Sequence, residues 1–178
     1  MGVDLVTEAE DWSVLPLEEL AERALAGVTA ELGLPGDVEI SLLACSDDRI
    51  AVLNGEFRDK PKATNVLSWP AEDLAPDTPG EPPLPLPPPD FPGEPPFLGD
   101  IALAFETCAA EAEAGGKPLG SHVMHLLVHG ILHLLGYDHV TDSDAVLMES
   151  TEVRILGQLG EPDPYGSESA SPTGRYLE

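Results

Sequence analysis

The feature that most constrains the fold is a segment, residues 118–135, that is apolar on almost every side of a helix. Pro118 stands at its start and Gly136 follows its end, as is typical of a helix. The apolar positions are Val123, Met124, Leu126, Leu127, Val128, Ile131, Leu132, Leu134 and Leu135. A helix that is hydrophobic all round is a buried helix. The sequence therefore predicts a central helix with other elements packed around it.

The five histidines of the chain all fall on or just after this helix, at positions 122, 125, 129, 133 and 139. The first four are spaced by three, four and four residues, so they lie along one stripe of the helix. Unpaired polar groups are costly to bury, so a row of buried imidazoles needs partners. A metal ion would satisfy several of them at once, and we therefore expect a metal site.

Three of these histidines have the spacing of a catalytic zinc site. His129 and His133 lie four residues apart and point the same way, and a sharp turn at Gly136 returns His139 towards them. The string His-x-x-x-His-x-x-Gly-x-x-His is the ligand spacing of the metzincin metalloproteases. Three histidines without a fourth protein ligand leave one coordination position open for catalysis. The sequence thus predicts one Zn²⁺ held by His129, His133 and His139.

A second reading frame starts at His125, but it fails at the later positions. In that frame the turn falls on Leu132 and the third ligand on Leu135. We therefore expect His122 and His125 to lie outside the ligand set, beside the site or on the helix surface.

The residue after the first ligand argues against a peptidase. A zinc protease of this type places a glutamate there, as general base for the attacking water. In this chain the position is Gly130. Peptide hydrolysis is therefore disfavoured, and an atypical metallopeptidase stays only as an alternative.

The whole string HGILHLLGYDH, residues 129–139, resembles the signature of the YbeY family, zinc-dependent endoribonucleases that mature bacterial ribosomal RNA. Other blocks of that family are matched in order at 53–58, 63–70, 98–103 and 148–165. Asn65 and Trp69 replace an aspartate and a phenylalanine of the usual second block, and we assign Asn65 no role. The resemblance covers about residues 38–165.

The resemblance implies a cytoplasmic enzyme that cleaves single-stranded ribosomal RNA, at the 3′ end of the 16S molecule. Its expected partners are that RNA and the small ribosomal subunit with its proteins, and neither DNA nor a membrane. A non-catalytic, zinc-stabilised ribosome assembly factor stays open as an alternative.

The charge of the chain restricts how it meets RNA. Acidic residues number 33 and basic residues 8, for a net charge of −25, which disfavours nucleic acid binding in general. Three of the eight cations fall within five positions, at Arg58, Lys60 and Lys62. Arg58 occupies the functional arginine position of the resembling family, so we expect it to be catalytic and to bind RNA. Lys60 and Lys62 are the further candidates for RNA binding, although a solvated basic turn would have the same composition.

The remaining pattern predicts an α+β fold in a single domain. Helical spacing or caps indicate helices over 17–32, 46–57, 106–114 and 142–159. Short β-rich segments indicate strands over 38–45, 65–69 and 98–105, and residues 3–14 favour an edge strand. With the resemblance, these elements imply a small mixed four-stranded sheet packed with about five helices, and a zincin-like metal helix buried centrally.

One segment stands apart from the predicted domain, which spans residues 1–165. Residues 71–97 contain 11 prolines in 27 positions and no cation, so they cannot form a helix or an interior strand. We expect a loop insertion that is dispensable for folding. Residues 166–178 are expected to be a disordered tail. With no signal peptide or membrane span apparent, Cys45 and Cys108 are expected to be reduced thiols in the cytoplasm.

Overall fold

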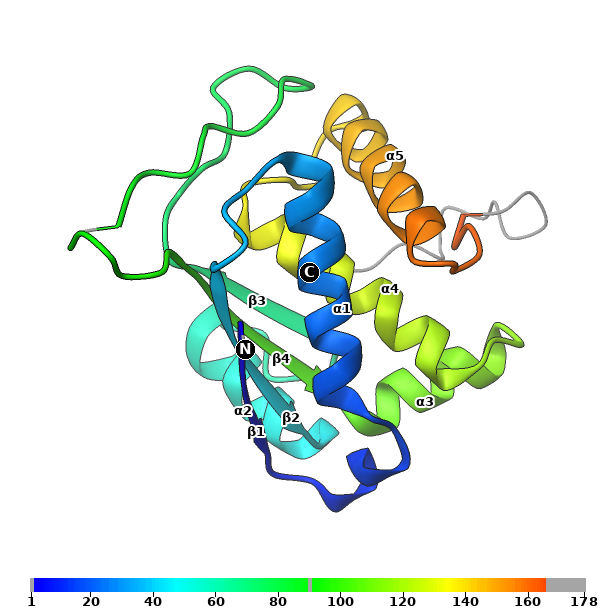
Figure 1. Ribbon diagram of the computed structural model, residues 1–178. Coiled ribbons are helices and arrows are strands. Elements are labelled where there is room, and N and C mark those ends of the chain that lie inside the picture. Colours follow the sequence, from blue (N-terminus) through cyan, green and yellow to red (C-terminus); the bar gives the residue numbers. More distant parts are fainter. Residues whose placement is uncertain (1, 90, 166–178) are drawn as a thin grey trace.

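The computed structural model describes residues 2–89 and 91–165, so the predicted tail lies outside the described residues. The strands are β1 (Val3–Thr7), β2 (Glu39–Cys45), β3 (Val66–Pro70) and β4 (Phe97–Ala104). The α-helices are α1 (Leu17–Leu32), α2 (Asp47–Arg58), α3 (Phe105–Ala114), α4 (Leu119–Leu134) and α5 (Asp142–Gln158). A short 3₁₀ helix, η1 (Glu10–Val14), precedes α1. The predicted α+β fold with a four-stranded sheet and five α-helices is confirmed (Figure 1).

The sheet is mixed, with the strand order β1-β2-β4-β3. Strands β1, β2 and β4 are parallel, and β3 runs antiparallel to β4, with Ser68 opposite Ile101. Strand β1 is an edge strand, as predicted, but it ends at Thr7 instead of continuing to residue 14. The chain leaves the sheet there because Trp12 turns into the core, where its indole N–H donates to the Cys45 carbonyl at 3.0 Å.

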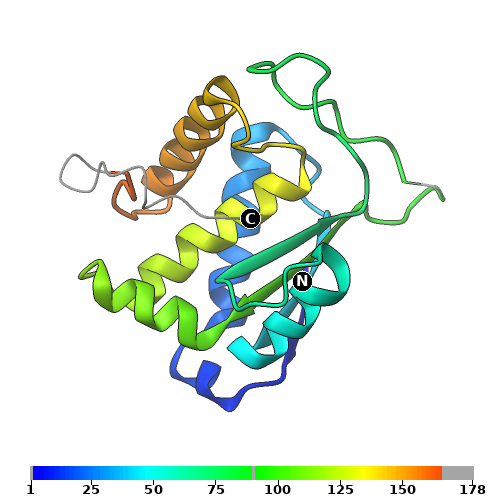
Figure 2. The ribbon, with the colours of Figure 1, turned by 180° about the vertical axis from the view of Figure 1, so that it is seen from behind.

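The two faces of the sheet are covered unequally. Helices α1 and α4 pack on one face and form the main core, which includes Leu42, Ile101 and Leu103 of the sheet. Helix α2 covers the other face through a smaller cluster, which includes Ile50 and Leu67. Figures 1 and 2 show α1 and α2 on opposite sides of the strands.

Helix α4 is the central helix that the sequence predicts. Every residue from His122 to Leu132 is buried, because α1, α3, α5 and the sheet all contact it. None of the helices in the described part of the chain combines the length and the hydropathy that a bilayer span requires.

The proline-rich segment contains no helix or strand among its described residues, 71–89 and 91–96. It runs as a long excursion beside the start of α5 (Figures 1 and 2), where Gly80 N donates to Asp144 Oδ1 at 2.8 Å. The apolar residues of this segment are not all exposed, however, because Leu74 is buried. Leu74 packs on the turn after α4, and a Cβ at Gly136 (φ +103°) would lie 2.6 Å from the Leu74 carbonyl oxygen. The expectation that the entire segment is dispensable therefore needs correction at this residue.

Candidate metal centre

The three predicted ligands come together at the C-terminal end of α4. His129 and His133 lie on its last turns, and His139 follows the turn at Gly136. Each offers a ring nitrogen, and the three nitrogens lie within 4.8 Å of one another. The Nε2 atoms of His129 and His133 are 3.1 Å apart. Two ligands of a tetrahedral metal ion would stand about 3.3 Å apart at the usual bond lengths, so the spacing suits an ion.

The opposite nitrogens of two of these rings are held by hydrogen bonds. His129 Nδ1 lies 2.6 Å from Glu152 Oε2, and His133 Nδ1 lies 2.9 Å from the Tyr137 carbonyl oxygen. Both partners are acceptors, so each ring places its hydrogen on Nδ1 and directs the lone pair of Nε2 towards the other histidines. Such outer hydrogen bonds are the common way in which proteins orient metal-binding histidines.

Protonation also favours metal binding. Burial, with repulsion from the neighbouring histidines, lowers the pKa of His133 to about 3. Burial likewise lowers the pKa of His139, so both rings are neutral at neutral pH, as metal ligands must be. Within the described residues, the buried Nε2 of His139 has no hydrogen-bond partner. An ion among the three rings would satisfy that atom, so the residues fit a metal.

Glu152 is the polar centre behind the site. Its carboxylate is fully buried on α5 and lies 2.6 Å from His129, 2.9 Å from His125 and 2.6 Å from the Tyr165 hydroxyl. Burial alone would raise the pKa of this carboxyl, but its electrostatic interaction with His129 and the hydrogen bonds from His125 and His129 outweigh burial and lower the pKa. Glu152 is therefore ionised, and it connects α4, α5 and the end of the described chain.

A second group could hold an ion in principle, and it shares one residue with the first. It comprises His125, His129 and Glu152, all buried. Its members already hydrogen-bond one another through the Glu152 carboxylate, whereas the first group contains an unsatisfied nitrogen at His139. The first group is consequently the better candidate, and the second acts as its support.

Sequence reasoning gave Glu152 no part in the site, although a signal was present. Helix α5 buries Ala145, Met148, Glu152 and Ile155, at the spacing of a single apolar stripe. An acidic residue in such a stripe is almost never buried without a partner. Tyr165 had no comparable signal, because it follows the last helix in a polar segment.

His122 lies apart from both groups. Its Nε2 is 2.8 Å from Glu111 Oε1 on α3, and the same oxygen accepts a hydrogen bond from the Asn65 amide at 3.0 Å. An aspartate at position 65 would place a second carboxylate against Glu111, and like charges that close cannot both ionise easily. The amide of Asn65 thus suits this neighbour.

Gly130 faces the sheet. A Cβ built there would lie 3.2 Å from Ile101 Cδ1 and 3.3 Å from Ser68 Oγ. At these distances Ile101 and Ser68 would have to give way by a few tenths of an ångström to admit a side chain at position 130. A protease-type glutamate there would meet a tight contact with the sheet, and the sequence does not supply one.

The basic cluster lies where α2 ends, beside the edge strand β3. Arg58 Nη2 donates to the Ser68 carbonyl oxygen, and Ser68 Oγ lies 3.4 Å from the Gly130 carbonyl oxygen on α4. Arg58 is half-buried, and Lys60 and Lys62 are exposed on the turn that follows. Hydrogen bonds through Ser68 thus connect Arg58 to α4. The two lysines are exposed to solvent.

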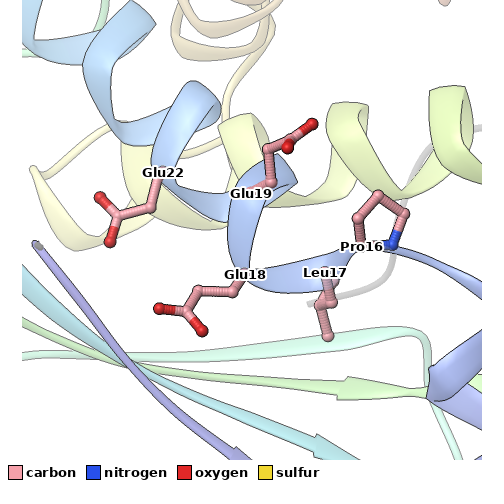
Figure 3. Close-up of a pocket in the computed structure, with 5 residues that line it drawn as sticks. All are labelled: Pro16, Leu17, Glu18, Glu19 and Glu22. Atoms are coloured by element: carbon pink, nitrogen blue, oxygen red, sulfur yellow. The ribbon is translucent and has the colours of Figure 1, made fainter.

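A hollow at the start of α1 is not a second candidate site for RNA. It is lined by Pro16, Leu17, Glu18, Glu19 and Glu22, and Figure 3 shows the three glutamates on the first two turns of the helix. Among the described residues that line it, there is no cation and no histidine. Three carboxylates would repel a phosphate, so this hollow does not suit RNA.

Comparisons with known proteins point to one family. The family model described as "Endoribonuclease YbeY" matches residues 5–160. The protein named Endoribonuclease YbeY from Ruegeria pomeroyi is 59% identical over 169 residues, which cover 94% of this chain and 100% of that protein. The protein of the same name from Jannaschia sp. is 55% identical and covers 93% of this chain and 100% of its own length.

Similarity in three dimensions extends to a solved structure. The solution structure of TM1509 from Thermotoga maritima matches with a TM-score of 0.52 and 21% identity, covering 93% of this chain and 99% of that one. At that identity the match concerns the fold alone. The family match and the close relatives both extend over nearly the whole chain, and the chain therefore belongs to the YbeY family of endoribonucleases.

Proposed function

We propose that this chain is a zinc-dependent endoribonuclease that cleaves single-stranded ribosomal RNA, in the maturation of the 16S 3′ end. The observation that carries the proposal is the convergence of three ring nitrogens from His129, His133 and His139. Neutral rings and a buried, unsatisfied Nε2 on His139 support an ion there. Three imidazoles suit Zn²⁺, which takes histidine nitrogen and keeps a position open in catalytic sites.

The chain's own residues would organise the reaction around that position. A bound Zn²⁺ supplies Lewis-acid polarisation of a phosphoryl oxygen, or a water whose pKa is lowered to about 7. Glu152 and the Tyr137 carbonyl hold two of the ligand rings in the required orientation. Ionised Glu152 also balances part of the positive charge that an ion brings into the core.

Arg58 is the proposed catalytic cation. Its guanidinium is anchored by the Ser68 carbonyl, on the strand that contacts α4 beside His129. A planar fork of N–H donors matches phosphate oxygens and stabilises charge that develops on phosphorus. Lys60 and Lys62 are exposed on the adjacent turn, and we assign them to RNA binding through phosphate contacts.

The acidity of the chain defines the kind of substrate. With a net charge of −25, long stretches of duplex RNA would be repelled from most of the surface. A short single-stranded segment, presented by the small ribosomal subunit, is compatible with one cationic turn.

Cys45 and Cys108 are free, buried thiols, which supports the expected location in the cytoplasm.

The proposal is tested by metal analysis of the purified protein and by cleavage of short single-stranded and duplex RNA, with and without a chelator. One zinc per chain and chelator-sensitive cleavage of the single strand are expected. His139→Ala should abolish both. His122→Asn serves as the matched control, because His122 pairs with Glu111 outside either candidate group, and it should retain zinc and cleavage.

Two outcomes would reject the proposal. Cleavage of casein instead of RNA would restore the metallopeptidase alternative. A His139→Ala protein that folds and still supports ribosome maturation would favour the assembly factor, in which zinc only stabilises the fold.

A further inference from the structure

An aromatic side chain lies exposed beside the basic cluster. Phe57, on the last turn of α2, is 66% exposed. Its ring meets the ring of Trp69 on β3 edge to face, with centroids 5.9 Å apart and an interplanar angle of 72°. Trp69 packs on the small core beneath α2, so it holds Phe57 at the surface in a defined position.

A planar cation adjoins these rings. The guanidinium carbon of Arg58 lies 5.8 Å from the centroid of the Trp69 ring, within the range of a cation–π interaction. Arg58 is fixed at the same time by the Ser68 carbonyl oxygen. Phe57 and Arg58 thus both adjoin the Trp69 ring, and we call these two rings and one guanidinium the aromatic platform.

The platform adjoins the basic turn, and hydrogen bonds through Ser68 link it to α4. After Arg58 the chain turns through Asp59, whose φ is +56°, and presents Lys60 and Lys62 to solvent. Ser68 is next to Trp69 on β3, and its Oγ lies 3.4 Å from the carbonyl oxygen of Gly130 on α4. Gly130 is the neighbour of His129 in the chain. A polyanionic strand that reaches the metal centre by the one cationic turn of the chain would pass this platform.

We propose that the aromatic platform stacks an unpaired base of the RNA substrate, while Lys60 and Lys62 hold the adjoining phosphates. Aromatic rings and guanidinium planes are the groups on which proteins stack splayed-out bases. Every base has a π-face, so this contact tolerates different sequences but requires a base that is not buried in a duplex. It would give the enzyme its preference for single strands, and in that sense it rests on the proposed function.

Equilibrium binding of a non-cleavable RNA tests the platform separately from catalysis. The probe is a short 2′-O-methylated oligouridine, measured against the zinc-loaded full chain. Phe57→Ala should weaken its binding about tenfold, the scale of losing one stacked base, and Phe57→Tyr should restore it. Phe91→Ala is the matched control, since Phe91 is also exposed, at 63%, but lies in the proline-rich segment. It should bind as the wild type does.

Tryptophan fluorescence gives a second readout. Trp12 is buried, at 2% exposure, so a change on adding RNA reports mainly on Trp69. Oligouridine should change the emission, and a ribose-phosphate oligomer of equal length without bases should bind more weakly and leave the emission unaltered. The loss caused by Phe57→Ala should vanish with this base-free oligomer, whereas Lys60→Ala should weaken both probes.

The outcomes separate the platform from the proposed function. If the wild type cleaves RNA but Phe57→Ala binds oligouridine as tightly as Phe91→Ala, the platform does not stack a base and only this inference fails. Normal oligouridine binding with weakened binding to the small ribosomal subunit would mean that Phe57 contacts a protein, which also overturns it. If the wild type neither binds nor cleaves any RNA, the proposed function itself fails.

Discussion

At the scale of single residues, Glu152 holds the ring of His129 so that its Nε2, the candidate metal ligand atom, faces the other histidines. Glu152→Gln keeps the shape but removes the charge that accepts hydrogen bonds from His125, His129 and Tyr165. We expect zinc affinity to fall about 10- to 100-fold, the usual effect of losing such a partner, in a competition titration against a chelator. Glu111→Gln is the matched control because Glu111 pairs with His122. Equal zinc affinity for both variants would show that the carboxylate does not orient His129.

Arg58 is the second residue whose contacts make a sharp prediction. Arg58→Ala removes the proposed transition-state cation but no candidate metal ligand, so zinc content should stay at the wild-type level. Cleavage should fall by about 10²-fold or more, and Arg58→Lys should recover only part because an ammonium lacks the planar fork. Arg49 lies on the same helix as Arg58 and forms an exposed ion pair with Glu8. The Arg49→Ala variant should cleave RNA normally. Wild-type cleavage by Arg58→Ala would remove this arginine from the mechanism.

At the scale of elements, the proline-rich segment has a buried position at Leu74 and exposed positions such as Leu84. Leu74 is buried against the turn at Gly136, which leads from α4 to His139. Leu74→Ala should lower the free energy of unfolding by about 2–3 kcal/mol, as large-to-small changes in a core do. Leu84→Ala, in the same segment but 46% exposed, should change it by less than about 0.5 kcal/mol. Urea unfolding measures both, and equal effects would mean that the segment does not anchor the turn.

At the scale of the whole molecule, buried neutral histidines make stability depend on pH. The pKa of His133 is about 3 in the folded chain and about 6.5 when unfolded. Between these values the unfolded chain binds a proton that the folded chain does not, so stability falls as the pH drops below 6.5. The lowered pKa of Glu152 acts in the same direction below its ordinary value of 4.5.

The expected size is about 1 kcal/mol of unfolding free energy for His133 between pH 7 and pH 5.5. Urea unfolding in excess chelator at these two pH values measures it without a contribution from zinc. His133→Asn should make the dependence shallower. A profile that is flat over this interval would mean that the folded chain accepts the proton on His133, against the pKa direction that burial imposes.

The sequence predicted the local features of this protein, because caps and periodicity act over a few residues. It predicted the buried helix α4, the edge position of β1 and a frame of three histidines whose rings the structure brings together. It also predicted the lack of regular structure in the proline-rich segment, since proline removes the backbone donor that a helix or strand needs.

The surroundings of these features could be known only from the three-dimensional packing, because they are formed by contacts between residues far apart in the chain. Glu152 reaches His129 only when α5 packs along α4, and Tyr165 joins them only through the path of the last segment. The packing of β3 and β4 on α4 makes a tight contact at Gly130. These positions depend on which faces of the elements meet, and no local pattern of residues specifies that.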